Sequence, residues 1–388
     1  MRPTCQDEAR AYVDGNNVQA VAFFLLALLI CFAAEGCGSG SSGGQNPPPP
    51  SPFTTVDAPG AHSASGYGTF GLSIDAAGDI AGYFIDANGV VHGFIRMSGG
   101  SIVTVDAPGA GTALNLGTNV RAINASGNAV GYYADSNSIL HSYIRNSNGT
   151  LMEFDPPNSI GSDAFCINDN GAVAGGLLDA NGDHGFVRGA DGTFSVIDPT
   201  GSPSDVLVVI PSQINSSGAI AGYYSDTNRV YHGFLRDSTG AITILDAPGA
   251  GTAADTGTEI VDINTDGVMV GAIAVGVVNG VVDTTNSFMR AADGTYTFFE
   301  PPQAVSSIAE GINDNGVIVG EYRDTNLVRH GYIRQADGSF ISFDEPNAAQ
   351  LPLSSVNIGT DPRRINLSGE IVGLYSDSAG VRHAFIMQ

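Results

Sequence analysis

The sequence predicts an all-β chain, a seven-bladed β-propeller of four-stranded blades. Three observations favour this class. The 388 residues include 52 Gly and no Trp, which suits short strands and tight turns better than long helices. A unit of short alternating apolar runs recurs, with successive copies starting 44 to 53 residues apart, a spacing typical of propeller blades. The repeat is also incomplete at its two ends. The last copy lacks a fourth strand, and an additional fourth strand precedes the first copy.

The repeated unit is clearest between residues 311 and 346, where it consists of four expected strands. A first strand ends at Asn313, and three more are expected at 317–322, 328–334 and 339–344. Asn-Gly and Asp-Gly pairs lie at the turns. These dipeptides favour hairpins, because type I′ turns need positive φ at both central residues.

The two ends of the repeated region predict how the blades close. The last copy stops after its third strand, and residues 53–57 form an additional fourth strand before the first copy. We expect this N-terminal strand to complete the last blade and close the ring, because closure protects exposed sheet edges. An open β-solenoid, which needs no complementary ends, is the alternative.

One His recurs at the same place in the third strand of six of the seven copies, and Asn286 replaces it in the fifth. The six are His92, His141, His184, His232, His330 and His383. Residues repeated in every blade lie far apart around a ring and cannot converge on one metal or substrate, so we expect a structural, hydrogen-bonded role. An Arg follows four positions later in every copy but the last. The acid that ends the fourth strand is the expected ion-pair partner of this Arg.

Small residues recur in the middle strands of each copy. A Gly stands at one position of every second strand, as at Gly82, and Gly, Ser or Ala at one position of every third strand, as at Gly93. We expect these positions to let a neighbouring blade or a large ring approach closely.

The sequence predicts three segments: an export signal at residues 1–36, a tether at residues 37–52 and the propeller domain at residues 53–388. Residues 20–34 form an apolar run too short to span a bilayer comfortably but suited to a signal-peptide core. Small residues precede Cys37 and a Gly/Ser- and Pro-rich stretch follows it, as in bacterial lipoproteins, whose acylated Cys becomes the N-terminus. We expect an extracellular or cell-envelope protein, with the outer membrane as one location. An ordinary signal peptide and full secretion are the alternative.

Charge and cysteine content limit the partners and the sources of stability. The formal net charge is −24, and all 15 basic residues are Arg. Such an acidic surface argues against nucleic acid and anionic lipid as partners, so we expect membrane contact only through the lipid anchor. We also expect the chain to be a monomer. Cys166 is the one thiol of the repeated region. It can form no internal disulfide there, and we expect it to be a small buried residue.

Standard catalytic and cofactor motifs are absent. The sequence has no P-loop, GxSxG, HExxH or CxxC pair, and no cofactor is expected. Residues 179–185 resemble part of a calcium loop but lack the Gly and the bidentate Glu of an EF-hand. A hairpin turn is the favoured interpretation, and a weak calcium site stays an open alternative.

The third-strand motif resembles that of a known family. His383, Ala384 and Phe385 spell His-Ala-Phe, and HGF, HSY and HGY variants stand in other copies. Residues 53–388 resemble the HAF family of extracellular repeats. The resemblance implies an exported bacterial protein of repeated short β units, and it implies no particular activity or cofactor.

The residues that differ between copies are the candidates for a binding site. The connections at 199–213, 274–286 and 344–364 vary most, and in a propeller these loops share one face. Polar residues of the first strands, expected to ring the mouth of the channel, and the one His outside the repeat are the candidate ligand-binding residues: Arg121, Gln213, Asp262, Glu310, Arg363, Arg364 and His62.

We expect a binding module for a surface glycan or another protein. One alternative is a glycan hydrolase or lyase, for which Asp262 and Glu310 in adjacent blades would supply paired carboxylates. A second alternative is a purely structural envelope protein, expected if no concave polar site exists.

Overall fold

The computed structural model describes residues 52–278, 281–350 and 359–388. The compact unit Phe53–Gln388 contains 28 β-strands and one 3-10 turn, η1 (Pro203–Asp205), with no α-helix among the described residues. No helix in this part of the chain is long and apolar enough to cross a membrane. The all-β prediction is confirmed. The predicted export signal, Cys37 and nearly all of the tether lie outside the described residues.

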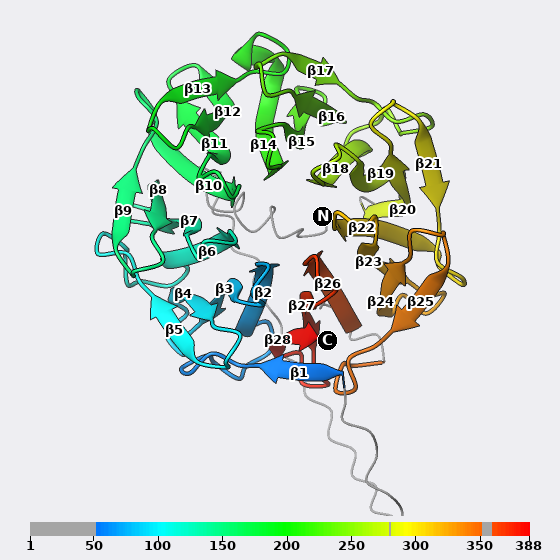
Figure 1. Cartoon of the computed structure of the whole chain (residues 1–388), viewed down its shortest axis with the longest axis horizontal. Coiled ribbons are helices and arrows are strands. Elements are labelled where there is room, and N and C mark those ends of the chain that lie inside the picture. The colour runs from blue at the N-terminus through cyan, green and yellow to red at the C-terminus, as the bar shows by residue number, and fades with distance from the viewer. Residues whose placement is uncertain (1–51, 279–280, 351–358) are drawn as a thin grey trace, which may run out of the picture. The chain divides into compact units, whose positions relative to one another are not determined.

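The strands pair in consecutive groups of four antiparallel strands, each group named here by its first strand, which lies nearest the centre in Figure 1. The bounds in chain order are β2 (Gly68–Ile74), β3 (Ile80–Ile85), β4 (Val91–Arg96) and β5 (Ile102–Val105); β6 (Gly117–Ile123), β7 (Ala129–Ala134), β8 (Leu140–Arg145) and β9 (Leu151–Phe154); β10 (Gly161–Ile167), β11 (Val173–Asp179), β12 (Gly182–Arg188) and β13 (Phe194–Ile197); β14 (Val206–Ile214), β15 (Ile220–Asp226), β16 (Tyr231–Arg236) and β17 (Ile242–Ile244); β18 (Gly257–Ile263), β19 (Met269–Val278), β20 (Val281–Arg290) and β21 (Tyr296–Phe299); β22 (Ser306–Ile312), β23 (Ile318–Arg323), β24 (Arg329–Arg334) and β25 (Phe340–Phe343); and β26 (Gly359–Ile365), β27 (Ile371–Ser376) and β28 (Arg382–Met387).

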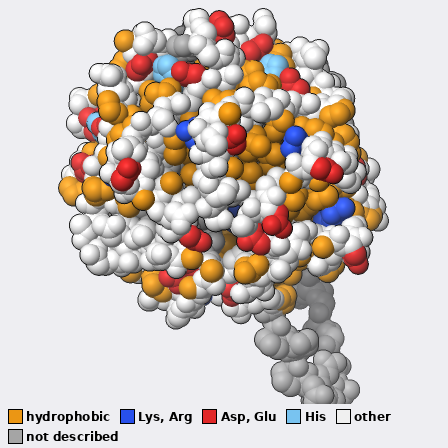
Figure 2. All heavy atoms as spheres, turned by 45° about the horizontal axis from the view of Figure 1, so that its top comes forward, with side chains coloured by type: hydrophobic (Ala, Val, Ile, Leu, Met, Phe, Trp, Pro, Cys, Tyr) orange, Lys and Arg blue, Asp and Glu red, His pale blue; other side chains and the backbone are white. Residues whose placement is uncertain are grey.

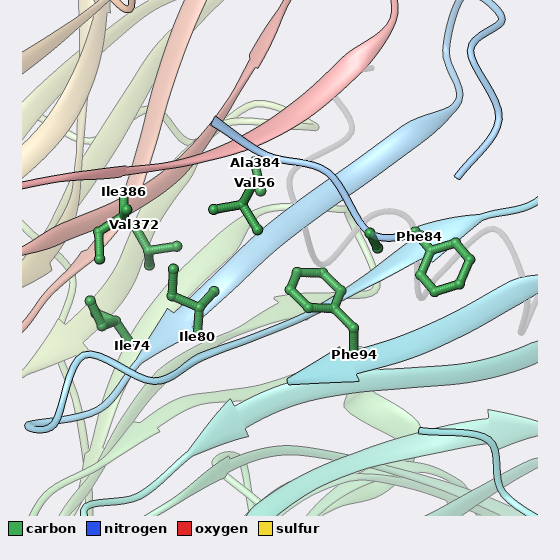
Figure 3. Close-up of a cluster of buried hydrophobic side chains, with 9 residues drawn as sticks. Val56, Ile74, Ile80, Phe84, Phe94, Val372, Ala384 and Ile386 are labelled. Carbon is green, nitrogen blue, oxygen red and sulfur yellow. The ribbon is translucent and has the colours of Figure 1, made fainter. Parts of the chain in front are cut away.

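The β26 group takes its fourth strand from the start of the compact unit. β1 (Phe53–Val56) pairs antiparallel with β28, from Phe53 opposite Met387 to Val56 opposite Ala384. Figure 3 shows Val56 packed with side chains from both ends of the unit, including Ile80 and Ile386. The expected pairing of the N-terminal strand with the last group is therefore present.

The ladder hydrogen bonds divide the strands into three sheets of 16, 4 and 8 strands. Between some neighbouring groups the ladder continues through a single parallel bridge, as at Val91 opposite Gly117 and Arg329 opposite Gly359. Elsewhere the groups meet through side chains. Each buried cluster draws on two successive groups, as when Ile95 of β4 packs with Val120 and Tyr143 of the β6 group. The hydrophobic core is thus distributed between groups.

The local structure follows from the turn residues and the small residues of the repeat. Gly316 and Gly338, at the turns of the β22 group, have φ of 75° and 89°, but Asn315 and Asp337 before them do not have positive φ. The predicted hairpins are present, but the predicted type I′ turn was wrong, because that turn needs positive φ at both central residues. A Cβ at Gly93 would lie 2.6 Å from a methyl group of Val120 in the next group. The predicted close approach of neighbouring groups is therefore present at this position.

Two of the three variable connections are largely strand, so the prediction that they are loops was wrong. Most of 199–213 belongs to β14, whose nine residues have the β-branched and apolar content of a strand. Nearly all of 274–286 extends β19 and β20, each ten residues long. The insertion lengthens the hairpin, because its apolar residues and central Asn-Gly favour pairing. Of the third connection, 351–358 lies outside the described residues.

Candidate functional site

Asn side chains link the inner strands in series. The Asn that follows an inner strand donates its amide to the backbone oxygen of the equivalent residue in the next group, at 2.9 to 3.3 Å. The six bonds run from Asn124 to Asn168, Asn168 to Asn215, Asn215 to Asn264, Asn264 to Asn313, Asn313 to Asn366, and Asn366 to Asp75. The Ile-Asn signature therefore has a structural role, which the repeated position of Asn before each turn could have indicated.

The six repeated His residues are held between acids at the periphery of the groups. Each donates its Nδ1–H to a carboxylate oxygen of the acid that follows the fourth strand, at 2.6 to 2.9 Å. The pairs are His92–Asp106, His141–Asp155, His184–Asp198, His232–Asp246, His330–Asp344 and His383–Asp57. Five of these rings also stack on an aromatic residue of the second strand, with centroids 4.9 to 5.1 Å apart. Through these contacts the six His residues connect the strands within a group.

The expected ion pair between the repeated Arg and the fourth-strand acid was wrong, because the acid pairs with the His instead. The guanidinium of Arg334 donates to the backbone oxygen of Gln335 and lies 4.8 Å from the Phe299 ring centroid. Arg188 likewise donates to Gly189. In the group without His, the amide of Asn286 donates to Glu300 Oε1 at 3.0 Å in its hydrogen-bonded orientation. The pairing is thus retained there by a different donor.

Three of the candidate residues, Glu310, Arg363 and Arg364, lie in the β22 and β26 groups, and an ionic network joins the first two. Arg329 pairs with Glu321 and with Asp361, and Arg363 donates to Asp361 at 2.7 Å. Arg363 Nη1 also lies 3.8 Å from Glu310 Oε1. Burial raises the pKa of Glu310 to about 7, although Arg363 opposes the shift.

Backbone N–H groups donate hydrogen bonds to both oxygens of the Asp262 carboxylate. Its two oxygens accept the N–H groups of Ile263 at 2.8 Å and Ile312 at 3.0 Å. Burial raises its pKa, and Arg364 and the Gln213 side chain act in the opposite direction. Arg364 itself donates to the backbone oxygen of Glu310. Asp262 is 5% and Glu310 8% exposed, so these two sit inside the packing and not at an open mouth, contrary to the expectation.

A second polar cluster gathers around β10. Arg121 of β6 lies 5.8 Å from the Phe165 ring centroid and interacts electrostatically with Asp163. Burial, with Asp183 adding to it, raises the pKa of Asp163 to about 8. Of this cluster, only Arg121 was among the candidates predicted from sequence.

The remaining single-residue predictions fall outside these clusters. His62 stacks edge-on against Tyr67, with centroids 5.2 Å apart. Asp179 accepts the backbone N–H of Asn181 and contacts His184 Nε2 at 3.1 Å, as a hairpin-turn residue does. Cys166 is 1% exposed, and burial raises the pKa of its thiol to about 12, so it is a buried thiol as expected. Within the described ranges, no group of three His, Cys, Asp or Glu could hold a metal ion.

The surface over the inner strands is mixed in character. Figure 2 shows apolar side chains gathered across the middle of one face, with scattered Arg and acidic side chains among them. This combination of an apolar area with a few charged groups is typical of small-ligand sites.

Solved structures similar to this one are β-propeller-like proteins. Virginiamycin B lyase from Staphylococcus aureus shares 14% identity at a TM-score of 0.53, over 87% of this chain and 99% of that one. The BP39L lectin from Burkholderia pseudomallei shares 8% identity at a TM-score of 0.50, over 81% and 94%. A prolyl endopeptidase shares 11% identity at a TM-score of 0.53, over 85% of this chain and 50% of its own.

At these identities the likeness concerns the fold alone. The chain is an all-β protein of β-propeller-like architecture. No family model matches it, and no curated protein matches it either.

Proposed function

We propose that the chain is an exported, lipid-anchored propeller of seven blades that binds a surface glycan or another protein. The pairing of β1 with β28 supports a ring closed by the N-terminal strand. The bond from Asn366 to the backbone oxygen of Asp75, 291 positions away, supports the same closure. Membership of the HAF repeat family is part of this proposal, because its His-Ala-Phe motif has a uniform role in the groups.

One observation carries the binding function. The residues that repeat in nearly all groups are used in structural bonds: the Asn links join neighbouring groups, and the His–acid pairs join strands within a group. The polar residues that differ between groups gather instead on inner strands, chiefly β6, β10, β22 and β26. Residues that a fold does not require, collected on the inner strands of a rigid scaffold, favour a ligand site. The likeness to a lectin at a TM-score of 0.50 agrees with this proposal.

Binding is favoured over glycan hydrolysis or lysis because the expected carboxylate pair is engaged. A glycosidase needs two carboxyl groups free to act on substrate. Both oxygens of Asp262 accept backbone N–H bonds, and Glu310 lies beside Arg363. A purely structural envelope role stays the alternative that the experiment below tests.

The remaining parts of the proposal concern location and partners. Lipidation at Cys37 would hold the protein in the cell envelope, with no other membrane contact. The net charge of −24 disfavours nucleic acid as a partner. We propose that the protein is a monomer that needs no cofactor, with weak calcium binding as an alternative.

The binding function is tested by thermal unfolding of the full chain with a panel of bacterial and plant glycans, divalent metals and EDTA. A ligand that binds only the folded state raises the melting temperature. We expect a shift with at least one glycan, reduced by Arg364→Gln. If no glycan or metal shifts the transition and the exported fraction yields no protein partner, the structural role replaces the binding role.

Lipidation is tested separately by membrane fractionation. The full chain should partition with membranes, and Cys37→Ala should release it, because acylation supplies the anchor. Equal partitioning of both chains into the soluble fraction would favour an ordinary signal peptide.

A further inference from the structure

We propose that the side chain of Arg364 binds the carboxylate of an acidic sugar between the inner strands. The proposal rests on the binding function above, and it names the contact residue and the class of ligand. Arg364 belongs to β26, one of the inner strands that surround the centre in Figure 1.

A β-bulge stands at the same place in every inner strand. In β26 the pairing with β27 shifts between Pro362 and Arg364, and the other inner strands shift at the equivalent position. Bulges re-aim side chains and are frequent beside functional sites. The residue that follows the bulge differs between groups: Ser73, Ala122, Cys166, Gln213, Asp262, Gly311 and Arg364. Only the β26 group thus places a positive charge at this position.

The guanidinium of Arg364 lies toward the centre of the inner strands. Its Nη1 donates to the backbone oxygens of Glu310, on β22, and of Arg363. Its charge also opposes the effect of burial, which raises the pKa of Asp262 and that of Cys166. Asp262 belongs to β18 and Cys166 to β10, and neither strand is next to β26. One guanidinium is therefore within electrostatic reach of residues from three other inner strands.

One edge of this guanidinium is available to a ligand. Nη1 is used in the two backbone bonds, and Nε and Nη2 make no hydrogen bond to any described residue. Arg364 is half-buried and has no ion pair with these residues, whereas Arg363 and Arg329 both pair with carboxylates. The edge formed by Nε and Nη2 presents two parallel N–H groups, which match the two oxygens of a carboxylate.

The nearby acids do not balance the charge of this guanidinium. Both oxygens of Asp262 accept backbone N–H groups, and Asp361 is shared by Arg329 and Arg363. Burial raises the pKa of Glu310 to about 7, so this carboxyl is partly protonated at neutral pH. A half-buried cation without a carboxylate partner favours an anionic group in a ligand.

An unpaired acceptor nearby favours a ligand that also carries a hydroxyl. Oδ1 of Asp361 has no hydrogen-bond partner among the described residues, and Asp361 is 1% exposed. Asp361 and Arg364 both belong to β26, and, after burial, the charges of both affect the pKa of Glu310. An unpaired buried acceptor destabilises the folded state unless a donor reaches it. A sugar acid holds carboxylate and hydroxyl groups on one ring, so it can bond to both residues with little loss of conformational entropy.

The test uses the full chain and matched pairs of glycosides: methyl glucuronoside with methyl glucoside, and methyl galacturonoside with methyl galactoside. The members of a pair differ only in whether the ring carries a carboxylate or a hydroxymethyl group. Binding is measured by saturation-transfer NMR and calorimetry at constant ionic strength. We expect at least one acidic glycoside to bind about tenfold more tightly than its neutral partner.

Substitutions locate the contact. Arg364→Gln should remove the preference for the acidic glycoside, and Arg364→Lys, which keeps the charge without the planar edge, should leave an intermediate preference. Arg229→Gln is the matched control. Arg229 is exposed between β15 and β16 and pairs with Asp255, so the same loss of charge there should leave the preference unchanged.

The outcomes separate this inference from the broader proposal. If acidic and neutral glycosides bind equally, or if folded Arg364→Gln keeps the preference, the inference is wrong and the binding function stands. If no glycoside binds, the inference is wrong, and the glycan panel and the search for a protein partner still decide the binding function. If N-acetylalanine binds through Arg364 and no sugar acid does, a peptide carboxylate replaces the sugar. If Arg364→Gln unfolds the chain by circular dichroism, Arg364→Lys decides.

Discussion

Asp75 is the one residue that interrupts the series of Asn links between inner strands. It occupies the position of Asn124 in the next group, and its carboxyl oxygen accepts the N–H groups of Ala77 and Asp79 as Asn124 does in its own turn. A carboxylate has no N–H to donate to the backbone oxygen of Asn124. Burial and the neighbouring Asp79 raise the pKa of Asp75, which also disfavours its charged form.

We therefore predict that Asp75→Asn stabilises the protein. The new amide would supply the missing link and remove a buried carboxyl, while its oxygen retains both turn bonds. The expected gain in free energy of unfolding is about 1 kcal/mol, measured by denaturant unfolding at pH 7. Asn264→Asp is the reverse control and should destabilise by a similar amount. A neutral or destabilising Asp75→Asn would contradict the structural role of the links.

At the scale of elements, β1 is the strand on which the last group depends. Its inward residue Val56 is 2% exposed and packs with Ile80, Phe94 and Val372. Thr54, two residues earlier, is exposed.

We predict that Val56→Asp destabilises the protein by at least about 2 kcal/mol, because it buries an unpaired charge in this cluster. Thr54→Asp carries the same change of charge at an exposed position of β1 and should have little effect. Both are compared by denaturant unfolding and by protease sensitivity near the two termini. Equal stability of the two variants would show that β1 is not required for the fold.

The elements could be predicted from sequence because turn residues and alternation recur with each copy. In the β22 group the expected strands at 317–322, 328–334 and 339–344 agree with β23, β24 and β25 within two residues at each end. The partner of the repeated acid could not be predicted, because the His and the Arg both lie on the same strand within reach of it. The polar cluster around β10 was missed for a related reason. Arg121, Asp163 and Asp183 come from three different strands, and which strands lie together is a property of the folded chain.

For the whole molecule, pH is the condition to which the buried groups are most sensitive. Burial raises the pKa of Asp163 to about 8 and that of Glu310 to about 7. In the unfolded chain both carboxyls ionise at lower pH. Between the unfolded-state and folded-state pKa values the folded state therefore binds more protons, and its stability falls as pH rises. The pKa of His232, His330 and His383 is raised from 6.5 by hydrogen bonds to acids. That stabilisation is present in full below pH 6.5 and is lost as pH rises through the folded-state values.

All of these groups act in the same direction, so we predict a higher melting temperature at pH 5.5 than at pH 8.5. The measurement is a series of thermal melts at constant ionic strength. Glu310→Gln should reduce the slope, because the amide cannot ionise. Asp337→Asn is the control, since Asp337 is an exposed turn residue with a lowered pKa and titrates below this range. A flat profile between the two pH values would contradict the raised pKa values.

The contact of Asp57 with His383, 326 positions apart, has a consequence for the time course of synthesis. A ribosome that adds about 5–20 residues per second needs roughly 15–65 seconds to pass from one of these residues to the other. Throughout that interval β1 has no partner, and a short strand with free backbone groups can pair with other chains. A newly made chain is therefore most exposed to misassembly before its β28 has emerged, and any factor that shields the N-terminal strand during this interval should raise the yield of folded protein.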